Sequence, residues 1–105
     1  MDFKTVITFG VISILAVILQ SCSPALYKPV PEHVSGNANY EQLVEGRKLY
    51  VNKCGSCHSL HLPHQYSADV WIKNIDEMQE RAKINETEKK LIADYLVFGI
   101  TQNNK

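Results

Sequence analysis

The sequence lacks an excess of either charge, because its 105 residues carry eleven Lys and Arg against eleven Asp and Glu. A neutral chain has no basic surface that would attract nucleic acid over a distance, so we expect no nucleic-acid partner. The chain is also too short for two domains. Cysteine is scarce, and its three residues are an odd number, which a simple disulfide framework does not explain. Cys22, Cys54 and Cys57 therefore each require a separate explanation.

Strand patterns are also lacking, since no stretch alternates apolar and polar residues with a period of two. Apolar residues instead recur at helical spacing, which predicts an all-α domain with three main helices. Ser67 is placed to cap the second helix, and Asn85 or Thr87 to cap the third, where Glu88 completes a capping box. Gly99 is a natural helix end. The predicted helices cover residues 40–53, 69–82 and 85–99.

A long apolar run is lacking as well. Residues 6–19 are apolar apart from three positions, and these fourteen residues are fewer than the ~20 that a membrane-spanning helix needs. This length is typical of a secretory signal peptide. The run ends in Leu19-Gln20-Ser21-Cys22, which resembles the lipobox of bacterial lipoproteins. The resemblance implies that residues 1–21 are a lipoprotein signal peptide and that Cys22 becomes a lipidated N-terminus.

The alternative for this segment is an uncleaved N-terminal anchor. Both interpretations place the rest of the chain in the bacterial cell envelope, on the periplasmic side, and attached to the inner or outer membrane. The residues after Cys22 include three prolines, Gly36 and two asparagines. This composition predicts a flexible tether over residues 22–39, leading to a domain of residues 40–105.

The segment Cys54-Gly55-Ser56-Cys57-His58 has the spacing of a c-type haem attachment motif. Two thiols three residues apart can reach the two vinyl groups on one edge of a porphyrin and form thioethers with them. His58 then lies under the iron and supplies its imidazole as the proximal ligand. We therefore expect one covalently bound haem c, with its iron, as the cofactor. With lipid on Cys22, all three cysteines are explained.

Three other interpretations fit two cysteines at this spacing. A redox-active pair of the thioredoxin type would follow a β-strand, which the pattern does not predict here. A zinc site could combine the two cysteines with His61 and His64, although its ligands would be crowded in sequence. A structural disulfide between Cys54 and Cys57 is the third alternative.

The sequence from the first predicted helix to the last resembles the class I cytochromes c. In that family a glycine stands eight residues, and an aromatic residue four residues, before the first haem cysteine; Gly46 and Tyr50 occupy these positions. The C-terminal helix of the family presents an apolar or aromatic set, which Leu91, Ile92 and Tyr95 match. The resemblance implies a small cytochrome c fold in which the N- and C-terminal helices cross at the glycine.

The iron needs a second ligand, for which Met78 is the first candidate. It is the only methionine apart from the initiator, and the twenty residues from His58 to Met78 allow the chain to pass around the haem edge. His61 and His64 are the alternatives. In longer members of the family a proline carbonyl accepts a hydrogen bond from the proximal histidine, and Pro63 or one of its neighbours is the candidate here.

Five side chains are expected to form the wall of the haem pocket: Tyr50, Leu62, Tyr66, Trp71 and Ile75. The pattern as a whole predicts a membrane-tethered carrier that transfers single electrons between redox partner proteins, and not an enzyme with a small-molecule substrate. The alternative is a haem subunit of a particular oxidoreductase complex, or a gas-binding haem sensor with an open sixth iron position.

Overall fold

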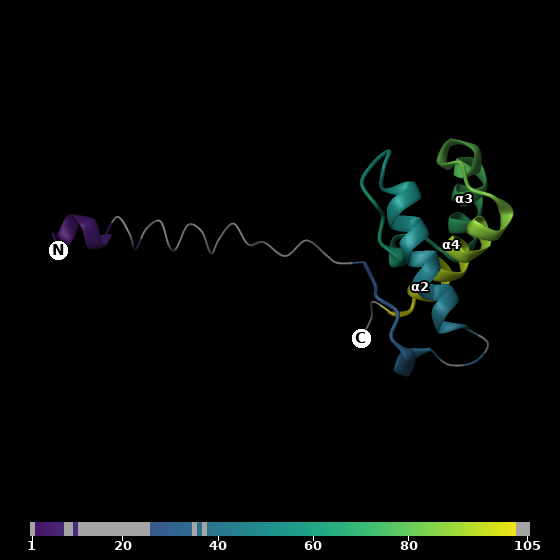
Figure 1. Ribbon diagram of the computed structural model, residues 1–105, viewed down its shortest axis with the longest axis horizontal. Helices are drawn as coiled ribbons and strands as arrows, with labels where there is room; N and C mark the ends of the chain where they lie inside the picture. Colours follow the sequence, from purple (N-terminus) through teal and green to yellow (C-terminus); the bar gives the residue numbers. More distant parts are fainter. Residues whose placement is uncertain (1, 8–9, 11–25, 35, 37, 103–105) are drawn as a thin grey trace.

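The computed structural model describes residues 2–7, 10, 26–34, 36 and 38–102, and across these residues the chain is helical without any strand (Figure 1). This confirms the predicted all-α class. Cys22 and most of the expected signal peptide lie outside the described residues. No helix in the described part of the chain is long and apolar enough to cross a membrane.

Three α-helices make up the domain, and their bounds agree closely with the prediction. The first predicted helix divides into an α-helix and a wider π-helical turn at its C-terminal end. Short 3₁₀ turns precede the first and second α-helices. In chain order the elements are η1 (Pro31–His33), α2 (Tyr40–Leu49), η2 (Tyr50–Cys54), η3 (Pro63–Gln65), α3 (Ala68–Ala82) and α4 (Glu86–Gly99).

Helices α2 and α4 cross in close contact at Gly46, as predicted. A Cβ at this position would collide with the backbone carbonyl of Leu91 and would lie 2.9 Å from Cβ of Tyr95. Only glycine therefore allows the two backbones to approach this closely. Ile92, Tyr95 and Leu96 on α4 are fully buried beside the crossing and form the centre of the core.

The helix caps agree with the prediction for α4 but not for α3. Asn85 caps α4 by accepting a hydrogen bond from the Glu88 backbone nitrogen at 2.9 Å, and Glu88 accepts one from the Asn85 nitrogen at 3.0 Å. Ser67 occupies the N-cap position of α3, but its side chain makes no capping hydrogen bond. The start of α3 therefore depends on its packing and not on a polar cap.

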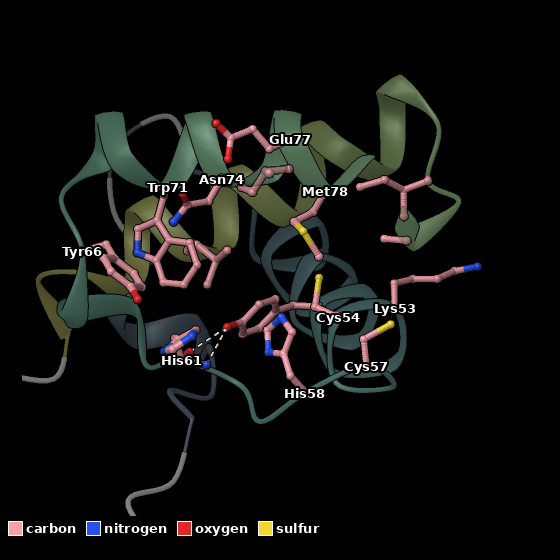
Figure 2. Close-up of a pocket in the computed structure, with 15 residues that line it drawn as sticks. Lys53, Cys54, Cys57, His58, His61, Tyr66, Trp71, Asn74, Glu77 and Met78 are labelled. Carbon is pink, nitrogen blue, oxygen red and sulfur yellow. Dashed lines mark hydrogen bonds between the residues drawn. The ribbon is translucent and has the colours of Figure 1, made fainter. Parts of the chain in front are cut away.

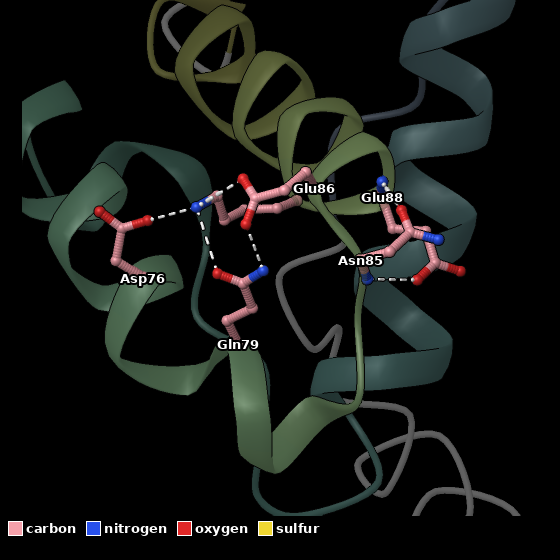
Figure 3. A network of polar contacts seen from close by, with 6 residues as sticks. Asp76, Gln79, Asn85, Glu86 and Glu88 are labelled. Atoms are coloured by element: carbon pink, nitrogen blue, oxygen red, sulfur yellow. Dashed lines mark hydrogen bonds and ion pairs between the residues drawn. The ribbon is translucent and has the colours of Figure 1, made fainter.

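The ammonium group of Lys89 on α4 joins this helix to α3 through a polar cluster, whose members Asp76, Gln79 and Glu86 are labelled in Figure 3. Nζ of Lys89 lies 2.9 Å from Oδ1 of Asp76 and 3.0 Å from Oε2 of Glu86, and it donates to Oε1 of Gln79 at 3.2 Å. The Gln79 amide in turn donates to Glu86 at 2.6 Å. Because Asp76 and Gln79 belong to α3, this cluster helps to set the angle at which α3 leaves α4.

Residues 26–30 pack against the helical domain, which differs from the flexible tether expected over residues 22–39. The Tyr27 carbonyl accepts hydrogen bonds from the Tyr95 hydroxyl at 2.7 Å and from Nε of Arg47 at 3.2 Å. The Tyr27 ring stacks against Tyr95 at a centroid distance of 6.3 Å, and Pro29 is buried. Proline-rich composition opposes regular structure but does not oppose docking of an extended chain, which is why the sequence pattern was misleading here.

Candidate functional site

A pocket opens between the haem-type motif and the inner face of α3 (Figure 2). It encloses about 220 Å³ and is open to solvent on one side. Its walls are mainly apolar and aromatic, with charged groups at Lys53 and Glu77. The lining residues that the sequence predicted are Tyr50, Cys54, Cys57, His58, Tyr66, Trp71, Ile75 and Met78.

The π-helical turn η2 brings the motif to one side of this pocket. Tyr50 begins the turn and Cys54 ends it, and both line the pocket together with Cys57 and His58. A π-helical turn contains more residues per turn than an α-helix, and such turns often occur at functional sites. The Tyr50 hydroxyl donates to the His61 carbonyl at 2.7 Å and accepts from the His61 nitrogen at 3.0 Å. This pair of bonds closes the loop that carries the motif.

The imidazole of His58 has a backbone partner that fixes its orientation. Nδ1 of His58 lies 2.8 Å from the carbonyl oxygen of Ser59, to which a protonated Nδ1 donates. That tautomer leaves Nε2 as the free, electron-donating nitrogen. The Pro63 carbonyl, the sequence-based candidate for this role, instead accepts a hydrogen bond from the Trp71 indole at 2.7 Å. Pro63 is fully buried beneath Trp71 and orders that side chain rather than His58.

Helix α3 forms the opposite wall of the pocket. Trp71, Ile75 and Met78 recur at spacings of four and three residues, so they share one helical face, and all three line the cavity. Figure 2 shows the Met78 thioether extending from α3 into the pocket, above the Cys54 thiol. Trp71 meets the rings of Tyr50 and Tyr66 edge-on, at centroid distances of 6.0 and 5.1 Å. These contacts hold the aromatic part of the wall in a defined position.

Burial governs the electrostatics of the motif. It raises the pKa of the Cys54 thiol, and the neighbouring Cys57 raises it further. Burial likewise raises the pKa of the Tyr50 hydroxyl well above its ordinary value. Reactive cysteines of redox enzymes have a lowered pKa, so the environment of Cys54 is unlike that of a thioredoxin-type nucleophile.

The other interpretations of the motif receive no support from the described residues. Cys54 and Cys57 are both free thiols, so they do not form a disulfide here. Among residues 38–102, no strand precedes the motif. Nowhere in the described ranges do three or more His, Cys, Asp or Glu side chains form a group that could hold a metal ion, which includes the suggested set with His61 and His64.

The residues present fit a haem group in chemistry and in direction. Two thiols and an oriented imidazole stand on one side of an apolar pocket, and a thioether extends from the other side. A volume of about 220 Å³ is less than the ~300–1,000 Å³ of clefts that bury drug-sized ligands. Only part of a porphyrin would therefore be enclosed, and the rest would extend through the open side.

The sequence pattern predicted most but not all of the residues that line the pocket. Leu62 was expected in its wall but does not line it, and His61 lines it whereas His64 does not. Two α3 residues that line the pocket, Asn74 and Glu77, were not predicted. Helical spacing was a signal for Asn74, which lies three residues after Trp71 and four before Met78 on the same face. Glu77 had no such signal. The other lining residues that were not predicted are Lys53, Ala82, Ile84 and Leu96.

The chain has no match among models of known protein families, curated proteins or solved structures.

Proposed function

We propose that this protein is a small mono-haem c-type cytochrome, tethered to the membrane by lipid on Cys22, that transfers single electrons between redox partner proteins outside the inner membrane. One observation carries the proposal. The two thiols and imidazole of a haem attachment motif and the only non-initiator methionine face a single apolar pocket from opposite sides. These are the four protein groups that a covalently bound, six-coordinate haem requires.

Each of these residues has a distinct task in the proposed site. Cys54 and Cys57 hold the porphyrin edge as thioethers, and His58 presents Nε2 while the Ser59 carbonyl orients its ring. Met78 supplies a thioether, which favours the ferrous state and raises the potential relative to a second histidine. Trp71 and Tyr50 exclude water from the buried side of the pocket. The haem, when bound, supplies an iron that alternates between its ferrous and ferric states.

Electron transfer without substrate chemistry is consistent with the surroundings of the pocket. Lys53 and Glu77, which carry opposite charges, line it and give no strong field of one sign. A partner would therefore be recognised mainly by the shape around the exposed porphyrin edge and less by long-range attraction. His58 and Met78 would together hold the iron, which would leave no coordination site for a substrate.

The test is whether the haem is covalently attached. Protein produced with a cytochrome c maturation system should retain its haem through acid–acetone extraction and on denaturing gels. The Cys54→Ala/Cys57→Ala double variant should lose it. Ser56→Ala is the matched control, since Ser56 lies in the same loop but supplies no thiol: its hydroxyl donates to the Lys53 carbonyl and lies 4.0 Å from the Cys57 sulfur. Haem that is extracted from the wild-type protein, or is never acquired, would refute the proposal.

A further inference from the structure

The point at which the chain leaves the domain determines how the domain can lie on a membrane. Residues 26–30 are docked on the side where α4 ends, and the ring of Tyr27 contacts the α4 residues Tyr95 and Phe98. A Cβ on Gly99 would lie 3.6 Å from Cδ1 of Tyr27. Figure 1 shows this blue segment passing the yellow C-terminal end of α4.

Several independent contacts hold this segment in place. Tyr95 and Arg47 both donate hydrogen bonds to the Tyr27 carbonyl, and Leu26 and Tyr27 pack against the hydrophobic core. The Tyr27 hydroxyl is buried without a hydrogen-bond partner among the described residues. Its contribution is therefore that of a packed aromatic ring, and not that of a polar side chain in contact with water.

The docked segment leaves very little chain between the domain and Cys22. Only three residues lie between Cys22 and Leu26, and the four residue steps from Cys22 to Leu26 span at most ~14 Å when extended. A free tether from Cys22 to Tyr40 would contain eighteen residues and would reach several times farther. None of residues 26–30 lines the pocket, and the rings of Tyr95 and Tyr50 stand between Tyr27 and the pocket.

We infer that the side of the domain formed by residues 26–30 and the end of α4 lies directly against the lipid bilayer, and that the pocket opens away from this contact. The inference rests on the proposed lipidation and haem attachment. Because only three residues lie between a lipid anchor at Cys22 and the docked Leu26, the anchor restrains the domain to one range of orientations. The exposed edge of the porphyrin would then be presented to partners in the aqueous phase and not to the bilayer.

The experiment compares two insertions of ten Gly and Ser residues in the lipidated holoprotein. One insertion lies between Pro24 and Ala25, before the docked segment, and the other follows the exposed Gly36, after it. Each variant is reconstituted in phosphatidylcholine vesicles that contain a lipid with a blue-emitting headgroup dye. Quenching of this dye by the haem reports the distance between haem and bilayer.

The first insertion should reduce the quenching about twofold or more, because ten flexible residues add about 17 Å of reach. The second should leave it unchanged, since the segment before it stays docked. Equal loss of quenching in both variants would overturn the inference and restore a flexible tether over residues 22–39. Mass spectrometry and the haem spectrum show, before reconstitution, whether the wild-type protein carries lipid and covalent haem. If it carries neither or only one of them, the proposed function is refuted, and the inference with it.

Two substitutions provide a measurement that does not involve the membrane. Tyr27→Ala should lower the urea midpoint of the holoprotein, because it removes a ring that packs on the core. Tyr27→Phe is the matched control and should keep the midpoint, since the hydroxyl has no partner. A Tyr27→Ala variant as stable as the wild type would show that the segment is not docked, and would also overturn the inference.

Discussion

At the scale of single residues, Met78 is the position where packing and chemistry coincide. We predict that Met78→Leu keeps the proposed covalent haem but lowers its reduction potential, by a measurable part of the ~0.8 V that axial ligands span. Leucine has a similar volume to methionine, so the α3 stripe stays filled while the thioether is lost. The reduced variant should also bind CO. Potentiometry and CO difference spectra measure both effects.

Ile75→Leu is the matched control for Met78, because Ile75 lies one turn earlier on the same pocket-facing stripe. It should change neither the potential nor the reactivity toward CO. If Met78→Leu leaves the spectrum and potential of the wild type unchanged, Met78 is not the ligand, and His61, which lines the pocket, becomes the first candidate. Wild-type protein that already binds CO would favour a gas sensor over an electron carrier.

Gly46 is the residue on which the helix crossing depends. We predict that Gly46→Ala lowers the free energy of unfolding by about 1–3 kcal/mol, because the new methyl group meets backbone atoms of α4 that cannot move aside independently. Urea unfolding of the holoprotein measures the change. Lys48→Ala on the exposed face of the same helix is the control and should fall within about 0.5 kcal/mol of the wild type. Equal stability of the two variants would contradict a close crossing.

At the scale of secondary-structure elements, the Lys89 cluster couples α3 to α4. We predict that Lys89→Met lowers the urea midpoint at low ionic strength, because it removes the ammonium group shared by Asp76 and Glu86 and keeps most of the apolar stem. Lys73→Met is the control: Nζ of Lys73 is exposed and lies 3.9 Å from Glu77 within the same helix. If Lys89→Met lowers the urea midpoint no more than the control does, the cluster does not couple the helices.

The same cluster predicts a dependence on pH. Hydrogen bonds from Lys89 to Asp76 and Glu86 raise the pKa of Lys89. The charged Lys89 therefore stabilises the folded protein fully below its ordinary pKa of 10.5, and this stabilisation is lost as the pH rises through the raised pKa. Hydrogen bonds from Gln79 and Lys89 lower the pKa of Glu86. The charged Glu86 therefore stabilises the folded protein fully above its ordinary pKa of 4.5, and this stabilisation is lost as the pH falls through the lowered pKa. The difference between Lys89→Met and wild type should therefore be largest between these limits.

At the scale of the whole molecule, the core and the pocket depend on each other. The chain from Cys22 onward has only 84 residues, and an unaided core of this size rarely supplies more than about 3–5 kcal/mol. We predict that the Cys54→Ala/Cys57→Ala variant without haem keeps much of its helical circular dichroism but unfolds at lower urea than the holoprotein. Gly46 and Leu91, which meet at the α2–α4 crossing, do not line the pocket, whereas Trp71 and Ile75 line it and would lose their contact with the cofactor. A haem-free variant as stable as the holoprotein would contradict this coupling.

Much of the fold was predictable, because it depends on short stretches of sequence. Apolar spacing located the three helices, and the capping box at Asn85 and Glu88 formed as expected. The resemblance to the class I cytochromes c, in which a glycine stands eight residues before the first haem cysteine, implied the place of Gly46 at the crossing. The prediction was less accurate where a group has several nearby partners: the Pro63 carbonyl pairs with Trp71, and His58 pairs with Ser59. Several carbonyls lie within reach of each donor, and spacing alone does not choose among them.

The sequence by itself determined the three helices and brought the two cysteines and the histidine of the motif close together, because both follow from covalent geometry and contacts within one or two turns. Only the tertiary structure decided which side chains share the pocket, and that residues 26–30 belong to the domain. The bond from the Tyr95 hydroxyl to the Tyr27 carbonyl joins residues 68 positions apart. Such contacts form only after the helices have packed, and no local pattern of prolines or apolar residues specifies them.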